Sequence, residues 1–300
     1  MQIITITVSA IISWALLSVV SRILLVNFDL DPWMFSFLQL VSGGLTLLLI
    51  GYRGAGGANS FARPSTWVLG ALRVLSAALY TAVLAIISVL ETGIISALNL
   101  PVVAVFVWVL HKQRPAAIAW VGHAILLVVV TVMARRIESD LQLTVLGLMG
   151  LNAMCLAAMN LIAEQHPENK TATLSGRAWF TGVVLAITAA MFLCLRILQG
   201  QEILTQITIP LILSSVIVGV LLRAPSMFLA FWAVSTAGAQ GYTAAISLLP
   251  LFGMVFEQAA VAVGLLDTSR FHVESLYLAL VALAGTLLIW FSGQAFVPKK

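Results

Sequence analysis

The chain has 300 residues, of which 61 % are hydrophobic and 9 % are charged, and its net charge is +4. Soluble domains carry about 25 % charged residues, most of them on the surface. The composition therefore excludes a water-soluble fold and predicts a protein that folds in a membrane. The basic residues are scattered singly between apolar runs, which argues against a nucleic-acid partner.

Ten apolar segments follow one another along the chain. Each is close to the roughly 20 residues that a spanning helix needs, and none alternates as the strands of a membrane barrel do. The sequence thus predicts an all-α, polytopic helix bundle, and its first segment reads as a span rather than a signal peptide. The predicted spans are 3–25, 32–51, 66–88, 93–110, 115–134, 143–163, 174–196, 208–233, 239–263 and 274–294.

Short polar connections separate the spans, so an even number of antiparallel helices places both termini on one side. If that side is the cytoplasm, eight basic residues lie inside and five outside, which is the expected bias. We therefore predict a multi-pass protein of the bacterial inner membrane with both termini cytoplasmic. The inner residues are Arg53, Arg63, Lys112, Arg114, Lys170, Arg177, Lys299 and Lys300, and the outer ones are Arg22, Arg135, Arg136, Arg196 and Arg270.

Two octapeptides point to an internal repeat. LRVLSAAL at 72–79 aligns with LRAPSMFL at 222–229, and four of the eight positions agree, among them Arg73 with Arg223. The prolines of spans four and nine fall one residue off the same register. An odd number of helices per copy would place two copies inverted in the membrane, an arrangement typical of carriers that work by alternating access.

Several features together resemble the EamA branch of the drug/metabolite transporter superfamily. These are two five-span halves, 1–140 and 141–300, small-residue runs that lead to a proline (GIISALNLPVVAVF and AQGYTAAISLLPLFGMVF), and the closing helix YLALVALAGTLLIW. The likeness covers nearly the whole chain. It implies a secondary transporter, not an enzyme, of metabolites such as amino acids, dyes, nucleobases, choline or sugar-linked compounds.

Arg73 and Arg223 are the leading candidates for substrate binding because a charge inside a span is costly unless it faces protein or water. Two guanidinium groups in one cavity would hold a carboxylate or phosphate in bidentate fashion. The alternative for Arg73 is that it snorkels to the headgroups.

Glu257 is a candidate for proton coupling, since protonation would relieve its burial. The alternatives are a fixed ion pair with Arg223 or a place nearer the outer rim. Pro101 and Pro250 each remove a backbone hydrogen bond, so they are either hinges beside the site or simple kinks.

Polar and aromatic residues in the spans complete the candidate set. Asn99 and Tyr242 are candidates to hydrogen-bond a ligand, with a link between two helices as the alternative for Asn99. His123 reads as an interhelical hydrogen-bonding residue. Aromatic side chains that would stack on a substrate, or else pack or anchor the bundle, are Trp14, Tyr80, Phe228 and Trp232.

Motifs for other chemistry are missing from the sequence. Cys155 and Cys194 lie in separate apolar runs, so no metal, disulfide or cofactor is predicted. We predict a transporter of an amino acid or small organic acid, with a cationic or neutral metabolite (choline, a nucleobase, a drug-like compound) and a lipid-directed intramembrane enzyme as alternatives. The expected partners are the small-molecule substrate and the bilayer, with the chain a monomer or homodimer. The sequon that begins at Asn169 lies on the predicted inner side and should be unused.

Overall fold

The computed structural model describes residues 2–52, 59–84, 86–87, 89–112, 114–170, 173–200, 207–267 and 273–294. Every helix or strand element found in these ranges is helical. The basic residues Arg53, Arg270, Lys299 and Lys300, used above for orientation, lie outside them. The elements are α1 (Gln2–Asn27), α2 (Pro32–Gly51), α3 (Asn59–Ala62), α4 (Pro64–Leu84), α5 (Val89–Ile95), η1 (Ser96–Leu98), α6 (Asn99–His111), α7 (Ala117–Ala134), α8 (Ser139–Gln165), α9 (Leu174–Leu198), α10 (Ile209–Val218), η3 (Gly219–Arg223), α11 (Ala224–Ile246), α12 (Leu249–Ala262), α13 (Val273–Ile289) and η4 (Trp290–Gln294).

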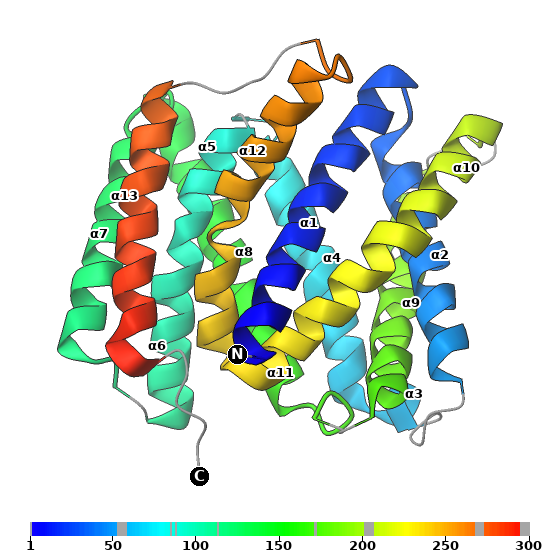
Figure 1. Cartoon of the computed structure of the whole chain (residues 1–300), viewed down its shortest axis with the longest axis horizontal. Helices are drawn as coiled ribbons and strands as arrows, with labels where there is room; N and C mark the ends of the chain where they lie inside the picture. Colours follow the sequence, from blue (N-terminus) through cyan, green and yellow to red (C-terminus); the bar gives the residue numbers. More distant parts are fainter. Residues whose placement is uncertain are drawn as a thin grey trace.

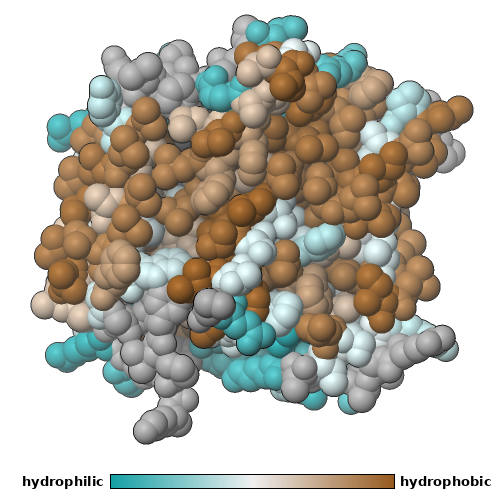
Figure 2. Space-filling model, in the orientation of Figure 1, coloured by the Kyte–Doolittle hydropathy of each residue, from teal (hydrophilic) through white to brown (hydrophobic). Residues whose placement is uncertain are grey.

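Among the described residues, eight helical stretches are long and apolar enough to cross a bilayer, and Leu249–Ala262 and Leu276–Ser292 are shorter apolar helices. Together they occupy the positions of the predicted spans and confirm a polytopic helix bundle. The helices lie side by side (Figure 1). α1 begins and α13 ends at the same end of the bundle, which we call the end that bears the termini. Apolar residues cover the middle of the visible face, and the hydrophilic ones gather at its two edges (Figure 2). This is the surface that a membrane-embedded protein requires.

The boundary between the eighth and ninth predicted spans carries a sharp kink. Helical structure runs from α10 through α11 to Ile246, past the predicted end at 233, but Gly238 has φ 77° and ψ 164°. These angles belong to no helix and suit glycine, which lacks a Cβ. The end of α11 after Gly238 therefore leads into α12, and the two together form the ninth span near its predicted position.

The prolines of spans four and nine have different surroundings. Pro250 is in the first turn of α12, and Pro101 is the third residue of α6, directly after the 3₁₀ turn η1. Pro250, in a first turn, removes no internal hydrogen bond, because those N–H groups have no helical partner. Pro101 lies inside the helical run Glu91–Leu110, so its missing N–H falls in mid-span, where the sequence placed it. Span nine is thus interrupted just before its proline, whereas span four continues through Pro101 with a 3₁₀ turn before it. The two spans meet, since a Cβ on Gly93 would touch the Pro250 ring at 3.4 Å.

Helix packing relates the two halves of the chain. α2 packs against α9, and α7 packs against α13. The contact of α4 with α8 corresponds to that of α11 with α1, and the contact of α6 with α8 corresponds to that of α12 with α1. If spans one to five are exchanged in order with spans six to ten, each of these helix contacts becomes either the same contact or another one named here. The division into repeats 1–140 and 141–300 stays a prediction, and this pattern supports it.

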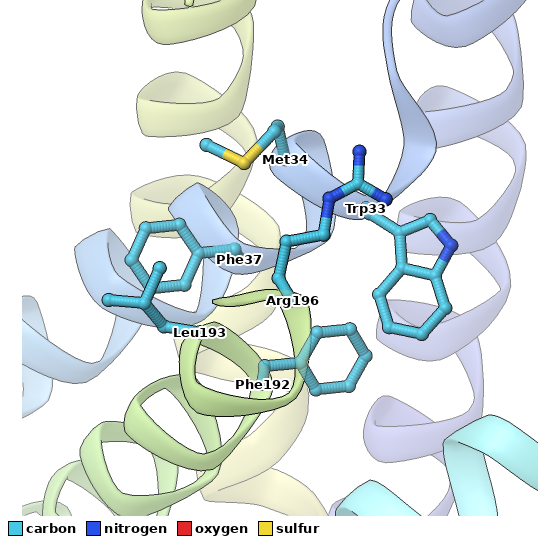
Figure 3. A pocket seen from close by; sticks show the side chains of 6 residues that line it. All are labelled: Trp33, Met34, Phe37, Phe192, Leu193 and Arg196. Atoms are coloured by element: carbon cyan, nitrogen blue, oxygen red, sulfur yellow. The ribbon is translucent and has the colours of Figure 1, made fainter. Parts of the chain in front are cut away.

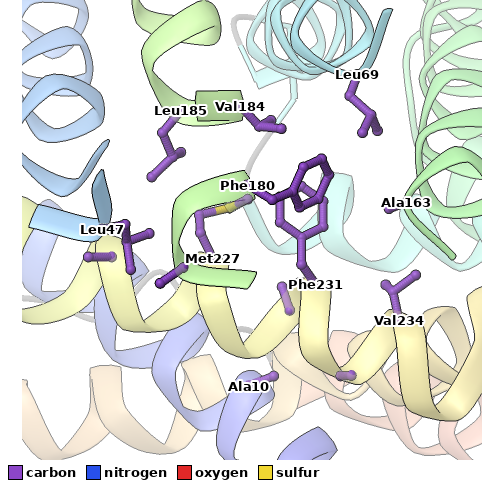
Figure 4. Close-up of a cluster of buried hydrophobic side chains, with 14 of the residues drawn as sticks. Ala10, Leu47, Leu69, Ala163, Phe180, Val184, Leu185, Met227, Phe231 and Val234 are labelled. Atoms are coloured by element: carbon purple, nitrogen blue, oxygen red, sulfur yellow. The ribbon is translucent and has the colours of Figure 1, made fainter. Parts of the chain in front are cut away.

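Glycines allow α2 and α9 to approach closely. A Cβ on Gly182 would lie 2.8 Å from the backbone N of Leu48, and one on Gly44 would lie 3.2 Å from the Cβ of Leu185. Small residues at such crossings are typical of membrane helices. Beside this contact lies the largest apolar cluster, in which Phe180 and Phe231 meet with ring centroids 5.3 Å apart (Figure 4).

Candidate functional site

Arg223 stands at the end of a π-helical turn, η3. Pro225, in the first turn of α11, has no N–H to donate to the preceding turn, and π turns arise at such interruptions. Glycines bring this turn close to α2. A Cβ on Gly219 would collide with the side chain of Ser42, and one on Gly43 would lie 3.2 Å from Cγ of Arg223. Side chains larger than hydrogen at these positions would push α2 away from Arg223.

The guanidinium of Arg223 contacts α2 and α1. Its Nη2 donates to Oε1 of Gln39 at 3.3 Å, and its Cζ lies 5.5 Å from the ring centroid of Trp14. Gln39 is buried, and its Nε2 donates to the hydroxyl of Ser21 at 3.3 Å. Nε of Arg223 is buried and has no hydrogen-bond partner among the described residues. Gln39 was absent from the sequence-based candidates.

Arg73 lies on α4, within electrostatic reach of both Arg223 and Tyr242. Its Nε is buried and has no hydrogen-bond partner in the described part of the chain. Within the same ranges neither Arg73 nor Arg223 forms an ion pair with a carboxylate. We call Arg73, Arg223, Trp14, Tyr242 and Gln39 the arginine centre.

The predicted aromatic residues divide between two regions. Trp14, Phe228, Trp232 and Tyr242 all belong to, or pack against, the cluster of Figure 4 that lies beside the arginine centre. Phe228 and Trp232 are one turn apart on α11, with ring centroids 5.8 Å apart. Tyr80 instead packs against a second apolar cluster.

Two other polar candidates stand apart. Asn99 lies at the start of α6, and its Oδ1 is buried and has no hydrogen-bond partner among the described residues. The prediction that His123 makes an interhelical hydrogen bond is wrong within the same ranges, since neither ring nitrogen has a partner. The ring of His123 packs edge-on against Trp120 instead, at 5.8 Å.

Glu257 forms an ion pair at the end of the bundle opposite the termini. Its Oε2 lies 2.6 Å from Nη1 of Arg22, which joins α12 to α1. The alternative pairing with Arg223 is therefore wrong, and the alternative of a place nearer the rim is the one that the geometry favours. Nearby, the side-chain amide of Asn27 donates to the carbonyl of Leu265 at 3.2 Å, a second link from the end of α1 to the segment after α12.

A buried polar cluster at the end that bears the termini was not predicted. We call Arg63, His166, Glu168, Asn169 and Arg177 the terminal-face cluster. Glu168 bonds the Ser60 hydroxyl and lies 3.4 Å from Nε of Arg63. Asn169 is fully buried, and its Nδ2 donates to the carbonyls of Ala163 and Phe231 at 2.8 and 2.9 Å. Such burial would keep a glycosyl group off Asn169 in the folded chain.

The same cluster is held by further charged and aromatic contacts. Arg177 donates from Nε and Nη2 to the carbonyl of Asn169 at 3.2 and 3.1 Å. Burial, and secondarily the charge of Arg63, lower the pKa of His166 to about 4. Burial raises the pKa of Glu168 against the opposing effect of Arg63. A neutral His166 fits its stacking on Phe180, with ring centroids 4.2 Å apart.

Two pockets differ in size and place. A pocket of about 380 Å³ opens at the end that bears the termini and is lined by residues of α1, α9, α11 and the connection after α8. We call it the vestibule. The second, of about 10 Å³, has room for one water and lies among Trp33, Phe192 and Arg196 (Figure 3). Arg196 there faces Asp31 at 3.6 Å, an ion pair typical of structure rather than binding.

Guanidinium groups such as those of the arginine centre can bind an anion. In the described residues no group of three or more His, Cys, Asp and Glu side chains is placed to hold a metal ion. What the centre offers is two guanidinium groups, an amide and two aromatic side chains, which can bind and orient a ligand. These are not the acid, base and nucleophile of a hydrolytic site.

Comparisons with known proteins agree with this description. A solved structure described only as "Crystal structure of protein" is 16 % identical, with a TM-score of 0.69 and 96 % of each chain covered, a likeness that shows the fold alone. No curated protein matches the chain. The model described as "EamA-like transporter family" matches residues 1–135, within the first predicted repeat. This match confirms, over residues 1–135, the resemblance seen in the sequence: that part of the chain matches the EamA-like transporter family, a branch of the drug/metabolite transporter superfamily whose members are multi-pass membrane transporters of small molecules.

Proposed function

We propose that this protein is a secondary transporter that exports or exchanges a small metabolite with an anionic group, an amino acid or another small organic acid, by alternating access. One observation supports an anionic ligand. Arg73 and Arg223 have buried Nε atoms without hydrogen-bond partners, and in the described residues no carboxylate neutralises them. Two like charges that share a site out of water repel one another and lose hydration. A carboxylate between them would relieve both costs.

The residues around the arginines orient them for such a ligand. Gln39 and the ring of Trp14 contact the guanidinium of Arg223, and its Nε keeps a donor that a ligand would use. A planar guanidinium binds a carboxylate with two parallel hydrogen bonds, a geometry that lysine does not reproduce. Arg223 therefore acts as the principal ligand-binding group, and Arg73 supplies the second charge.

Movement of the two five-helix halves would expose this site to each side in turn. The ion pair between Arg22 and Glu257 joins α1 to α12 at one end, and the vestibule opens at the other. Glu257 remains our candidate for proton coupling, because its protonation would break that ion pair. The sequence contains no ATP-binding motif, so the driving force is a proton gradient, substrate exchange or downhill flow. We place the protein in the bacterial inner membrane, as a monomer or homodimer with both termini in the cytoplasm.

Uptake into vesicles that contain the purified protein tests the proposal. Labelled amino acids, organic acids, nucleobases and choline are screened with and without a pH gradient. We expect anionic or zwitterionic compounds to move and Arg223→Gln to abolish their movement. Transport of cationic or neutral compounds alone would overturn the anionic ligand, and chemical conversion of an added lipid without transport would favour an enzyme.

The matched control is Arg135→Gln, which removes one positive charge from an exposed position at the end of α7. It should leave flux unchanged. An equal loss of flux in Arg135→Gln and Arg223→Gln would show that net charge, rather than the arginine centre, controls transport.

A further inference from the structure

The vestibule has the composition of a second ligand site, separate from the arginine centre. It is lined by Gln2, Lys170, Leu174, Arg177, Trp232, Ser235 and Thr236. Its volume of about 380 Å³ falls within the range of small-molecule pockets. Two of the lining side chains are cations and none is acidic, so the vestibule is positively charged. A ligand held here needs an anionic group.

The hydroxyl groups of the vestibule select for a second, positive group. Ser235 and Thr236 both donate their hydroxyl protons to the carbonyl of Trp232 at 2.9 Å. A hydroxyl with its proton engaged by its own helix presents oxygen lone pairs, so it acts as an acceptor. An ammonium group is the donor that such a pair of acceptors fits best.

Trp232, which lines the vestibule, lies on the same helical run as Arg223. Cζ of Arg177 lies 5.3 Å from the ring centroid of Trp232, which fixes the ring beside a cation. Trp232 contacts Phe228, and Arg223 is nine residues before Trp232 on the same helical run, or roughly 13 Å along the axis. A ligand that leaves the vestibule past these rings moves toward Arg223.

We propose that the vestibule is a staging site for a small zwitterion with a carboxylate and an ammonium group. Lys170 binds the carboxylate, the charge of Arg177 adds to the attraction while its guanidinium stays bonded to Asn169, Ser235 and Thr236 accept from the ammonium, and an apolar side chain lies on Trp232. The idea rests on the proposed transport function and narrows its substrate class to amino acids. It adds a site on the path to the arginine centre.

Binding of three fluorinated probes, followed by ¹⁹F NMR on the full chain in phosphatidylcholine nanodiscs, tests the staging site. 4-Fluorophenylalanine carries both charges, 3-(4-fluorophenyl)propanoate lacks the ammonium, and 4-fluorophenethylamine lacks the carboxylate. We expect the zwitterion to bind best, the propanoate about threefold more weakly and the amine about tenfold more weakly. Equal binding of zwitterion and propanoate would overturn the role of the two hydroxyl groups.

Variants separate the vestibule from the arginine centre. Lys170→Gln should weaken the zwitterion about three- to tenfold, whereas Lys112→Gln, an exposed lysine at the same end of the bundle, should not. The double variant R73Q/R223Q should retain vestibule binding. Binding lost in R73Q/R223Q but unaffected by Lys170→Gln would overturn the staging site and leave the proposed function standing. Binding insensitive to all of these changes would overturn both.

Discussion

The arginines at the ends of the bundle and those in its middle have different surroundings. Arg22 pairs with Glu257, Arg196 with Asp31, and Arg177 with the carbonyl of Asn169. Arg73 and Arg223 have no carboxylate partner among the described residues. Arg22, Arg177 and Arg196 thus have their partners within the protein and stabilise the fold, whereas Arg73 and Arg223 each keep an Nε donor without a partner in the described residues.

The largest effect expected from this difference is on transport. Arg223→Gln removes the bidentate donor, and we expect anion flux to fall at least about a hundredfold, which corresponds to about 2.7 kcal/mol of lost binding in the transport cycle. Folding should not suffer, because the change removes a buried charge that has no internal counter-ion. Flux into proteoliposomes and the melting temperature, measured on the same preparation, check both statements.

Arg223→Lys sharpens the result. It keeps the charge but loses the planar fork, so flux should recover only in part. Full recovery would show that charge alone suffices and would contradict the bidentate geometry.

The converse effect is expected at Arg177. Arg177, in the terminal-face cluster, donates two hydrogen bonds to the carbonyl of Asn169 and lies beside the ring of Trp232. Arg177→Gln removes both of these hydrogen bonds and the cation. We expect a loss of about 3 kcal/mol in the free energy of unfolding. The melting temperature should fall further than in Arg223→Gln, whereas flux per folded molecule should fall far less than in that variant. An unchanged melting temperature would show that Arg177 contributes no more to the stability of the fold than Arg223 does.

These contrasts also show what the sequence could and could not predict. Hydropathy located the spans because each needs an uninterrupted apolar run. The aligned octapeptides pointed to Arg73 and Arg223 because a charge inside such a run is rare. Gln39 gave no comparable signal, since a single neutral amide hardly lowers the hydropathy of α2. Its role depends on Gly43 and Gly219, which let two distant helices meet.

The connection after α8 shows a second limit of sequence reasoning. EQHPENK has the composition of an exposed loop, yet His166 and Asn169 are buried. Asn169 is buried because its amide satisfies carbonyl oxygens from two different helices, Ala163 of α8 and Phe231 of α11. Such a contact depends on tertiary structure and leaves no local pattern. The break before Pro250 likewise leaves no local pattern, whereas Pro101 lies in mid-span as the sequence predicted.

A smaller effect concerns the stability of the terminal-face cluster in acid. The pKa of His166 is about 4 in the folded protein, against an ordinary value of 6.5. Between these two values the unfolded chain binds a proton that the folded chain does not, so stability falls as the pH drops from 6.5 toward 4. We expect a loss on the order of 2 kcal/mol from this group.

His166→Gln should remove this dependence of stability on pH. The difference in melting temperature between wild type and variant should therefore narrow as the pH falls. Glu168 acts in the opposite sense, because its raised pKa makes the folded chain bind its proton first. Glu168→Gln therefore serves as the control and should steepen the acid loss. Melting temperatures measured from pH 7.5 to 4.5 distinguish the two, and parallel curves for wild type and His166→Gln would contradict the burial of a neutral imidazole.

The smallest effect on stability is expected at the ion pair opposite the termini. Arg22 and Glu257 are each about one-fifth exposed, so solvent screens the pair, and breaking it should cost about 1 kcal/mol. Its effect on coupling is the sharper test. If protonation of Glu257 releases α1 from α12, then Glu257→Gln and Arg22→Gln should both make flux independent of an imposed pH gradient while downhill exchange persists. If the gradient still drove flux in both variants, the ion pair of Arg22 with Glu257 would be purely structural, like that of Arg196 with Asp31. Proton coupling would then depend on another residue.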